Sequence, residues 1–415
     1  MKPKLNLNLV ALILLLSPVS SCVANPSLTQ NSDALTLASP SPPIALQPVP
    51  ASAPPSVPAK PNNNKLGRQQ PYSVIDEGKQ PRFSVTGSQV FSKGLLPNYQ
   101  VDFNESDLLN VLVNVKKYFD NHAQQDPDVL REGLLGTQGL TIADIRQTLD
   151  FMISVLTEDM ALKRPTRLKD SSFINTHFQV IKWKPYNPQQ PNQNQLRITQ
   201  YAVFSHLGSR TKTAKFDTPI YQLLPGLAPP EFYKKYTKQE VLSGLYERGG
   251  SSYGKVAPLA YLTRQGLEDA LLQGTILVRF KNGASAFYNV DRSNGIPYQR
   301  GIEPRNQKRY WYFKQVESIK GYGHQIDTKI PIRPGVTFAG DVLNIGLGKI
   351  ILLEQSSGSA KKLRLGIMAD SGGAFLPNLH QLDFLAGIFP SHAEFQRQQP
   401  QVPAYADVYI LIKKK

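Results

Sequence analysis

The sequence predicts a mainly β protein with a few helices, in the α+β class. Two segments before residue 162 repeat apolar side chains at helical spacing. A hairpin signal follows near residue 282, and alternating apolar stretches dominate from there to the C-terminus. No internal repeat is visible. The roughly 345 residues from position 67 onward are enough for two domains or one large one.

Residues 1–22 resemble the signal peptide of a bacterial lipoprotein. Lys2 and Lys4 precede an apolar run at 9–16, which is far shorter than the roughly 20 residues of a membrane-spanning helix. The run leads into "VSSC" (19–22), which is similar to the lipobox whose cysteine is acylated after cleavage. Cys22 is the only cysteine, so disulfides and cysteine-rich metal sites are excluded. The alternative interpretation is an ordinary secretory signal with an incidental cysteine.

Residues 23–66 have the composition of a disordered tether. The segment is rich in Pro, Ser, Ala and Asn, with ten prolines between Pro26 and Pro61 and almost no charge. Proline-rich chain extends by about 3.1 Å per residue, so the segment could span on the order of 100 Å. It would let a folded body work at a distance from a lipid anchor. A dispensable leader is the alternative.

Three helices are predicted in the folded part. Residues 104–122 and 141–160 each present an apolar stripe at helical spacing, so both helices should pack on a core. A third helix should begin at Thr237, because Thr237 and Glu240 have the spacing of a capping box ahead of an apolar run.

The predicted strands follow this third helix. Residues 276–280 and 284–288 alternate on either side of Asn282-Gly283, a dipeptide suited to a two-residue type I′ turn. Further strand candidates are 309–316, 349–354, 363–369 and 406–413.

Composition and motifs narrow the class of function. The formal net charge is +16, but the basic residues are scattered, and nucleic acid is not expected for an exported chain. Peptidoglycan carries peptide carboxylates and fits both the charge and the compartment. The chain has no phosphate-binding glycine loop of the P-loop type and no His-Glu-x-x-His. Neither a metal site nor a cofactor is therefore expected.

Two carboxyl groups are candidates for acid–base chemistry. The alternating stretch 363–369 should deliver Asp370 to a loop mouth, where Gly372 and Gly373 leave the backbone open to a polymer. Asp383 lies in an apolar run, where burial and a nearby Asp370 would raise its pKa. A carboxylic acid that stays protonated near neutral pH can act as a general acid. The structural alternative is that Asp370 caps a turn and Asp383 starts a loop or helix.

The stretch "DSG" (370–372) is similar to the active-site tripeptide of aspartic peptidases, in which two carboxylates share a proton. The tripeptide occurs once, so such a peptidase would have to be a homodimer. This remains a minor alternative.

A broader resemblance is to the membrane-bound lytic murein transglycosylase A family, and it extends from about residue 70 to the C-terminus. The similar stretches, in the family's order, are "FDTPIYQL" (216–223), "TKQEVLSGL" (237–245), "LLQGTILVRFKNG" (271–283), "NGIPYQRGI" (294–302), "PIRPGVTFAGD" (331–341), "MADSGGAF" (368–375), "LDFLAG" (382–387) and "ADVYILIKK" (406–414). The three stretches between 331 and 387 are similar to the family's C-terminal module, which is named for its three aspartates, and 406–414 is similar to its final strand.

The resemblance implies two lobes, one of them a six-stranded double-psi β-barrel, with a glycan groove between them. The body would span 67–330, and 331–415 would complete the barrel. The implied reaction cleaves the β-1,4 bond between N-acetylmuramic acid and N-acetylglucosamine and leaves a 1,6-anhydro end. Asp383 takes the position of the family's acid/base, with Asp370 beside it and Asp341 in support. The implied groove residues are Gln273, Gly274, Asn294, Gly295, Tyr298, Gly372 and Gly373, with Tyr221 as a further part of a sugar-binding floor.

Two stretches depart from the family pattern. The basic residue that the family has after Gly-Gly-Ala is replaced by Phe375-Leu376, and residues 200–204 are a degenerate version of another motif. A noncatalytic peptidoglycan-binding lipoprotein is therefore the alternative function. The expected partners are the glycan strand and, through the lipid anchor, a membrane; cell-wall synthesis or division proteins are further candidates. The expected location is the outer membrane, facing the periplasm.

Overall fold

The computed structural model of the protein describes residues 70–415 apart from 227–228, 298, 300, 358–359, 373–375 and 399–400. All of them belong to the second of the two units into which the chain divides, Leu66–Lys415. The predicted signal peptide and tether lie outside the described residues, as do Cys22, Tyr298 and Gly373. The predicted domain limits, including the one at 330/331, stay a prediction.

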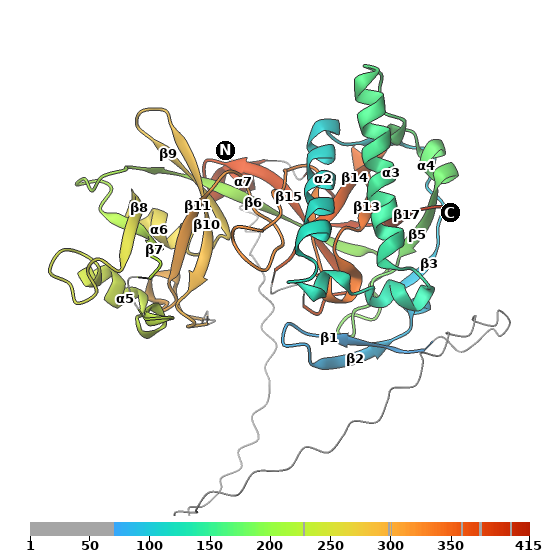
Figure 1. Ribbon diagram of the computed structural model, residues 1–415. Coiled ribbons are helices and arrows are strands. Elements are labelled where there is room, and N and C mark those ends of the chain that lie inside the picture. Colours follow the sequence, from blue (N-terminus) through green and yellow to red (C-terminus); the bar gives the residue numbers. More distant parts are fainter. Residues whose placement is uncertain are drawn as a thin grey trace, which may run out of the picture. The chain divides into compact units, whose positions relative to one another are not determined.

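The strands carry most of the regular structure (Figure 1). They are β1 (Tyr72–Ile75), β2 (Pro81–Val85), β3 (Phe91–Lys93), β4 (Gln100–Asp102), β5 (Phe178–Trp183), β6 (Leu196–Gly208), β7 (Thr218–Leu223), β8 (Val256–Leu262), β9 (Thr275–Phe280), β10 (Ser285–Ser293), β11 (Trp311–Val316), β12 (Thr337–Ala339), β13 (Ile350–Ser357), β14 (Ala360–Asp370), β15 (Gln381–Phe389), β16 (Tyr405–Ala406) and β17 (Val408–Lys413).

Two of the α-helices are long and the others are short. The α-helices are α1 (Gly87–Val90), α2 (Glu105–His122), α3 (Ile142–Ala161), α4 (Ser171–His177), α5 (Lys238–Glu240), α6 (Arg264–Ala270) and α7 (His392–Arg397). Short 3-10 turns occupy Pro127–Leu130, Gly133–Gln138, Arg167–Lys169, Phe232–Lys235 and Pro304–Asn306, and π-helical turns occupy Val241–Leu245 and Val342–Gly346. The predicted α+β class, mainly β with a few helices, is confirmed.

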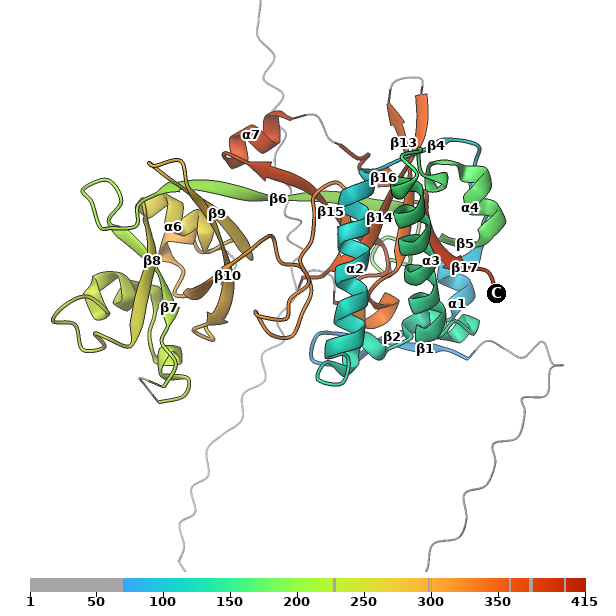
Figure 2. The ribbon, with the colours of Figure 1, turned by 45° about the horizontal axis from the view of Figure 1, so that its top comes forward.

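Thirteen strands in the described part of the chain share one sheet. Its path runs β11-β10-β9-β6-β15-β12-β14-β13-β17-β5-β3, with β16 paired to β6 and β4 paired to β14. Strand β6 is parallel both to β15, through residues 197–204, and to β9, through residues 205–208. Figures 1 and 2 show this long strand running from the part of the fold that holds β15 to the part that holds β9.

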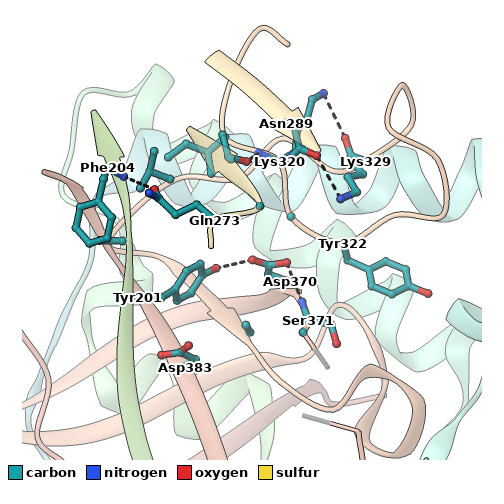
Figure 3. A pocket seen from close by; sticks show the side chains of 18 of the residues that line it. Tyr201, Phe204, Gln273, Asn289, Lys320, Tyr322, Lys329, Asp370, Ser371 and Asp383 are labelled. Carbon is teal, nitrogen blue, oxygen red and sulfur yellow. Dashed lines mark hydrogen bonds between the residues drawn. The ribbon is translucent and has the colours of Figure 1, made fainter. Parts of the chain in front are cut away.

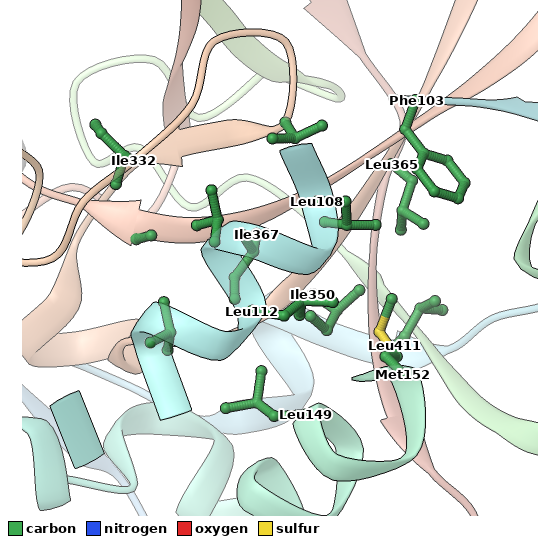
Figure 4. Close-up of a cluster of buried hydrophobic side chains, with 14 of the residues drawn as sticks. Phe103, Leu108, Leu112, Leu149, Met152, Ile332, Ile350, Leu365, Ile367 and Leu411 are labelled. Atoms are coloured by element: carbon green, nitrogen blue, oxygen red, sulfur yellow. The ribbon is translucent and has the colours of Figure 1, made fainter. Parts of the chain in front are cut away.

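The two long helices form as the sequence predicts. Asn104 caps α2 by accepting the Asp107 N–H at 2.9 Å, and Thr141 forms a capping box with Asp144 ahead of α3. Their apolar stripes bury Leu108 and Leu112 of α2 against β13 and β14, with Leu149 and Met152 of α3 in the same cluster (Figure 4). This core supports the strands that end at the candidate site.

A second part of the fold has its own core. The residues of this cluster all lie between Ile220 and Phe313, and many are tyrosines in edge-to-face contact. This separate core supports the expected two lobes. The closure of six strands into a double-psi β-barrel stays a prediction.

Two local predictions need correction. The capping box at Thr237 forms, but α5 has a single turn and continues as a π-helical turn in which Gly244 has φ +94°. The two-residue type I′ turn at Asn282-Gly283 is wrong. Phe280 N–H bonds Ala284 O at 2.8 Å, which leaves a three-residue loop, and only Gly283 has positive φ, at +83°. This is a type I turn closed by a glycine bulge.

Within the described residues, no helix has both the length and the apolar character needed to cross a membrane.

Candidate active site

A pocket of about 570 Å³ lies along β6, where β12 and β14 end and β15 begins. Strands of the large sheet, the loop before β9 and the segment 319–329 all contribute to its wall. Figure 3 shows the polar side chains that face one another there. The lining residues are 200–204, 272–275, Asn289, 319–323, Lys329, Ala339, 370–372, Asp383, His392 and Phe395.

Strand register brings two of the predicted aspartates to this pocket. Ala339 of β12 pairs with Asp370 of β14 on one side and with Asp383 of β15 on the other. Neighbouring strands lie about 4.8 Å apart, so the two aspartate Cα atoms are separated by roughly 10 Å. The small side chain of Ala339 between them leaves room for both carboxyl groups to face the same space.

Asp370 is held by hydrogen-bond donors. The alternating stretch of β14 buries Leu363, Leu365 and Ile367, and the strand ends at Asp370. The Tyr201 hydroxyl donates to Oδ2 at 2.7 Å and the Ser371 N–H donates to Oδ1 at 2.8 Å. Burial raises the pKa of Asp370 to about 6, while these two donors and the Lys329 charge oppose that rise.

Asp383 differs from Asp370 in its hydrogen bonds. Its Oδ1 is buried and has no hydrogen-bond partner among the described residues. Burial, with a smaller contribution from Asp370, raises its pKa to about 6, and a Thr199 hydrogen bond opposes the rise. A carboxyl group in this setting holds its proton to higher pH than an exposed one and presents a free oxygen to whatever occupies the pocket.

Asp341 lies outside the pocket lining and is fully buried. Its Oδ1 accepts the Asn344 N–H at 2.9 Å, and its Oδ2 accepts the Asn344 side-chain amide and the Asn378 N–H, both at 2.8 Å. Burial raises its pKa to about 6 against these hydrogen bonds. Asp341 therefore does not face the pocket. Its hydrogen bond with the Asn378 N–H holds the segment that follows Asp370 in place.

The other predicted site residues divide into two groups. Gln273, Gly274 and Gly372 line the pocket, and the Gln273 Oε1 accepts the Phe204 N–H at 2.9 Å. Asn294, Gly295 and Tyr221 lie elsewhere. The buried Asn294 side chain bonds backbone groups of Tyr236, Lys308 and Tyr310. Tyr221 packs on Tyr246 in the core of the second part and does not line this pocket.

Several residues that line the pocket were not among the site residues predicted from the sequence. Tyr201, which bonds Asp370, lies in the stretch 200–204 that already stood out as a degenerate motif. Lys329, Lys320 and Asn289 come from segments without a motif, so their place in the pocket wall depends on tertiary structure alone.

In the described residues, no group of three or more His, Cys, Asp or Glu side chains could hold a metal ion.

No family model matches the sequence, and no curated protein matches it significantly. Solved structures do match the fold. A membrane-bound lytic murein transglycosylase from Agrobacterium tumefaciens has a TM-score of 0.53 and 16% identity, over 78% of this chain and 97% of that chain. E. coli MltA with bound chitohexaose has a TM-score of 0.52 and 17% identity, over 82% and 99%. MltA from Neisseria gonorrhoeae has a TM-score of 0.50 and 14% identity, over 83% and 98%. The chain therefore has the fold of the MltA lytic transglycosylases.

Proposed function

We propose that the chain is a lytic transglycosylase of peptidoglycan. It cleaves the β-1,4 bond between N-acetylmuramic acid and N-acetylglucosamine and leaves a 1,6-anhydromuramic end. The observation that carries the proposal is the unpartnered, buried Oδ1 of Asp383 in a pocket that also holds Asp370. The fold, shared with lytic murein transglycosylases, supports it.

Asp383 performs both proton transfers of this reaction. As the acid, it gives its proton to the glycosidic oxygen as the bond to the anomeric carbon breaks. As the resulting carboxylate, it takes the proton of the muramic acid 6-hydroxyl, whose oxygen attacks that carbon. Hydrolytic glycosidases use a second carboxyl group as nucleophile or water activator. Here the substrate's own hydroxyl replaces it, so one acid/base residue is enough.

Asp370 is the charged neighbour of this acid. Its donors Tyr201 and Ser371 stabilise the carboxylate form, and a carboxylate close by keeps the proton on Asp383. The same negative charge stabilises the positive charge that develops on the sugar ring in the transition state. Asp341 contributes indirectly, because it holds the segment that follows Asp370.

The pocket wall fits a glycan strand. Phe204, His392 and Phe395 form a cluster of rings with centroids 5.8–6.5 Å apart. Such rings offer flat apolar faces to sugar rings, and the Gln273 side chain supplies an amide group nearby. E. coli MltA, which has the same fold, binds chitohexaose in its solved structure.

The N-terminal sequence supports a membrane-anchored enzyme. In this proposal Cys22 carries the lipid, residues 23–66 form the tether, and the body faces the periplasm from the outer membrane. Two or more acyl chains hold a protein on a membrane stably, whereas one chain alone does not.

The test is to digest purified murein sacculi with the full chain and to weigh the products by mass spectrometry. The proposal expects muropeptides with anhydro ends, each lighter by one water than the hydrolytic product. Glycan binding without any product would select the noncatalytic binder instead. Peptide fragments released with inhibition by a pepstatin-type compound would select the aspartic peptidase.

A further inference from the structure

The segment between β11 and β12 forms a hairpin that is fastened beside Asp370. Gly321 N–H donates to Ile330 O and Ile330 N–H donates to Tyr322 O, both at 2.8 Å. Tyr322 N–H donates to the carbonyl of Ala369 at 3.0 Å. The hairpin therefore bonds the residue that immediately precedes Asp370, and its position relative to that carboxyl group is fixed by backbone contacts.

Two glycines let this hairpin approach so closely. A Cβ on Gly321 would lie 2.5 Å from the Ala369 carbonyl oxygen, and a Cβ on Gly323 would lie 2.6 Å from the Cα of Lys329. Neither position has space for a side chain. The close packing places Lys329, on the returning arm of the hairpin, in the pocket wall opposite Asp370 (Figure 3).

The Lys329 ammonium is held in place without a close counter-ion. Its Nζ donates to Asn289 Oδ1 at 3.3 Å, and Asn289, itself 1% exposed, donates its amide to Thr275 Oγ1 at 2.7 Å. Among the ion pairs of the described residues, none includes Lys329. The Asn289 amide is uncharged and cannot neutralise the Lys329 ammonium. The positive charge of Lys329 therefore acts on the groups that line the pocket.

The charged and titratable groups around the two carboxyls come from several elements. Tyr201 of β6, the Ser371 N–H and Lys329 act on Asp370, and Asp370 in turn acts on Asp383 of β15. Asp370, Asp291 of β10 and Lys320 act on Lys329, and Arg197 of β6 acts on Asp383. Asp370 thus has two hydrogen-bond donors and a cation, whereas Asp383 has an oxygen without a partner and a neighbouring carboxylate.

We propose that Lys329 is a positioning residue that keeps Asp370 ionised while Asp383 carries the proton, which makes Asp383 the acid of the pair. The catalytic role of Lys329 rests on the proposed transglycosylase function. The electrostatic effect of Lys329 on Asp370 does not depend on that function.

The direct test is a titration of the Asp370 side chain in the full chain. Carboxyl ¹³C resonances from labelled aspartate are followed with pH, and Asp370→Asn assigns the signal. We expect Lys329→Met to raise the Asp370 midpoint by about one pH unit, at the lower end of the one to three units expected for a nearby opposite charge. Lys329→Arg should restore the midpoint. Lys329→Gln, which keeps a polar group beside Asn289, should behave like Lys329→Met.

Lys314→Met is the matched control. Lys314 forms an exposed ion pair with Asp327 in the same region and does not line the pocket, so the Asp370 midpoint should stay unchanged. An Asp370 midpoint that does not move in folded Lys329→Met and Lys329→Gln would overturn the proposal.

Kinetics give a second readout. The acid limb of the pH profile of kcat reports the ionisation of Asp370. Lys329→Met should therefore move this limb to higher pH. At pH values on the limb, kcat should fall about tenfold. A rise in KM with an unmoved limb would instead make Lys329 a substrate contact and contradict the proposal. Absence of anhydro product from the unmutated chain would refute the proposed function, while the titration would still decide the inference about Lys329.

Discussion

At the residue scale, the site depends on one buried and two partly buried carboxyl groups that differ in their hydrogen bonds. Asp341 accepts three, Asp370 accepts two, and one oxygen of Asp383 accepts none from the described residues. A buried polar atom without a partner costs stability, typically about 1–3 kcal/mol. Such a cost is common at functional sites, where the free atom serves a ligand.

This cost makes stability depend on pH. Asp383 titrates near its ordinary value in the unfolded chain and at about 6 in the folded protein. Between these values the folded state binds more protons, so the free energy of unfolding falls as pH rises through this window. We expect Asp383→Asn to be more stable than the unmutated chain by about 1–3 kcal/mol at pH 7.

The measurement is denaturant unfolding at pH 4 and pH 7. The advantage of Asp383→Asn should be small at pH 4, where the unmutated carboxyl is protonated, and should develop by pH 7. An equal difference at both pH values would mean that the substitution acts through packing and not through charge.

The sequence identifies Asp370 and Asp383 as candidates but not their geometry. Their separation along the chain says nothing about Ala339, which the sheet places between them. The same limit applies to Lys329, because no local pattern relates residue 329 to residue 370. Asn294 and Tyr221 lie in stretches that resemble the family and were predicted to line the groove. In the structure their side chains serve local packing instead.

At the element scale, regular helices were predictable and two key strands were not. The stripes of α2 and α3 have clear periodicity and good caps. Strands β6 and β15 each pair with other strands on both edges. Each also carries polar residues toward the pocket. Their sequences therefore lack a simple alternation of apolar and polar residues. The hairpin at Asn282-Gly283 was predictable in place but not in turn type, because only Gly283 adopts positive φ.

The short helix α7 provides an element-scale prediction. Phe395 of α7 contacts Phe204 of β6 and Phe389 of β15 at centroid distances of 6.1 and 5.1 Å, and it lines the pocket. If its ring supports a sugar, Phe395→Ala should weaken glycan binding by about 1 kcal/mol, or roughly fivefold in KM, with little change in kcat.

Steady-state kinetics on soluble glycan strands would measure this effect. Phe83→Ala is the control, because Phe83 stacks on Tyr186 and does not line the pocket. A fall in kcat with unchanged KM in Phe395→Ala would contradict a binding role for the ring.

At the scale of the whole molecule, the pocket forms where two separately packed parts meet. Strand β6 pairs with β15 of one part and β9 of the other, and residues 200–204, which line the pocket, precede its change of partner. The order of similar stretches along the sequence made this general fold predictable. The pairing of β6 with both β15 and β9 joins residues far apart in the sequence, and no local pattern encodes it.

The proposed anchor gives a prediction for the whole chain. Cys22→Ser should remove the acylation site, so the protein should move from the outer-membrane fraction to the soluble periplasmic fraction with its specific activity unchanged. Fractionation and metabolic labelling with a fatty acid would measure this. Persistent membrane association without label would contradict a lipid anchor at Cys22.

The central claim is that the Asp383 carboxyl group is the acid and base of bond cleavage. The most direct measurement is the rate at which folded Asp383→Asn, compared with the unmutated chain, releases anhydromuropeptides from sacculi. An amide of the same size cannot donate or take up the proton, so the rate should fall by about 100-fold to 10,000-fold. A rate within a few-fold of the unmutated protein would contradict the account.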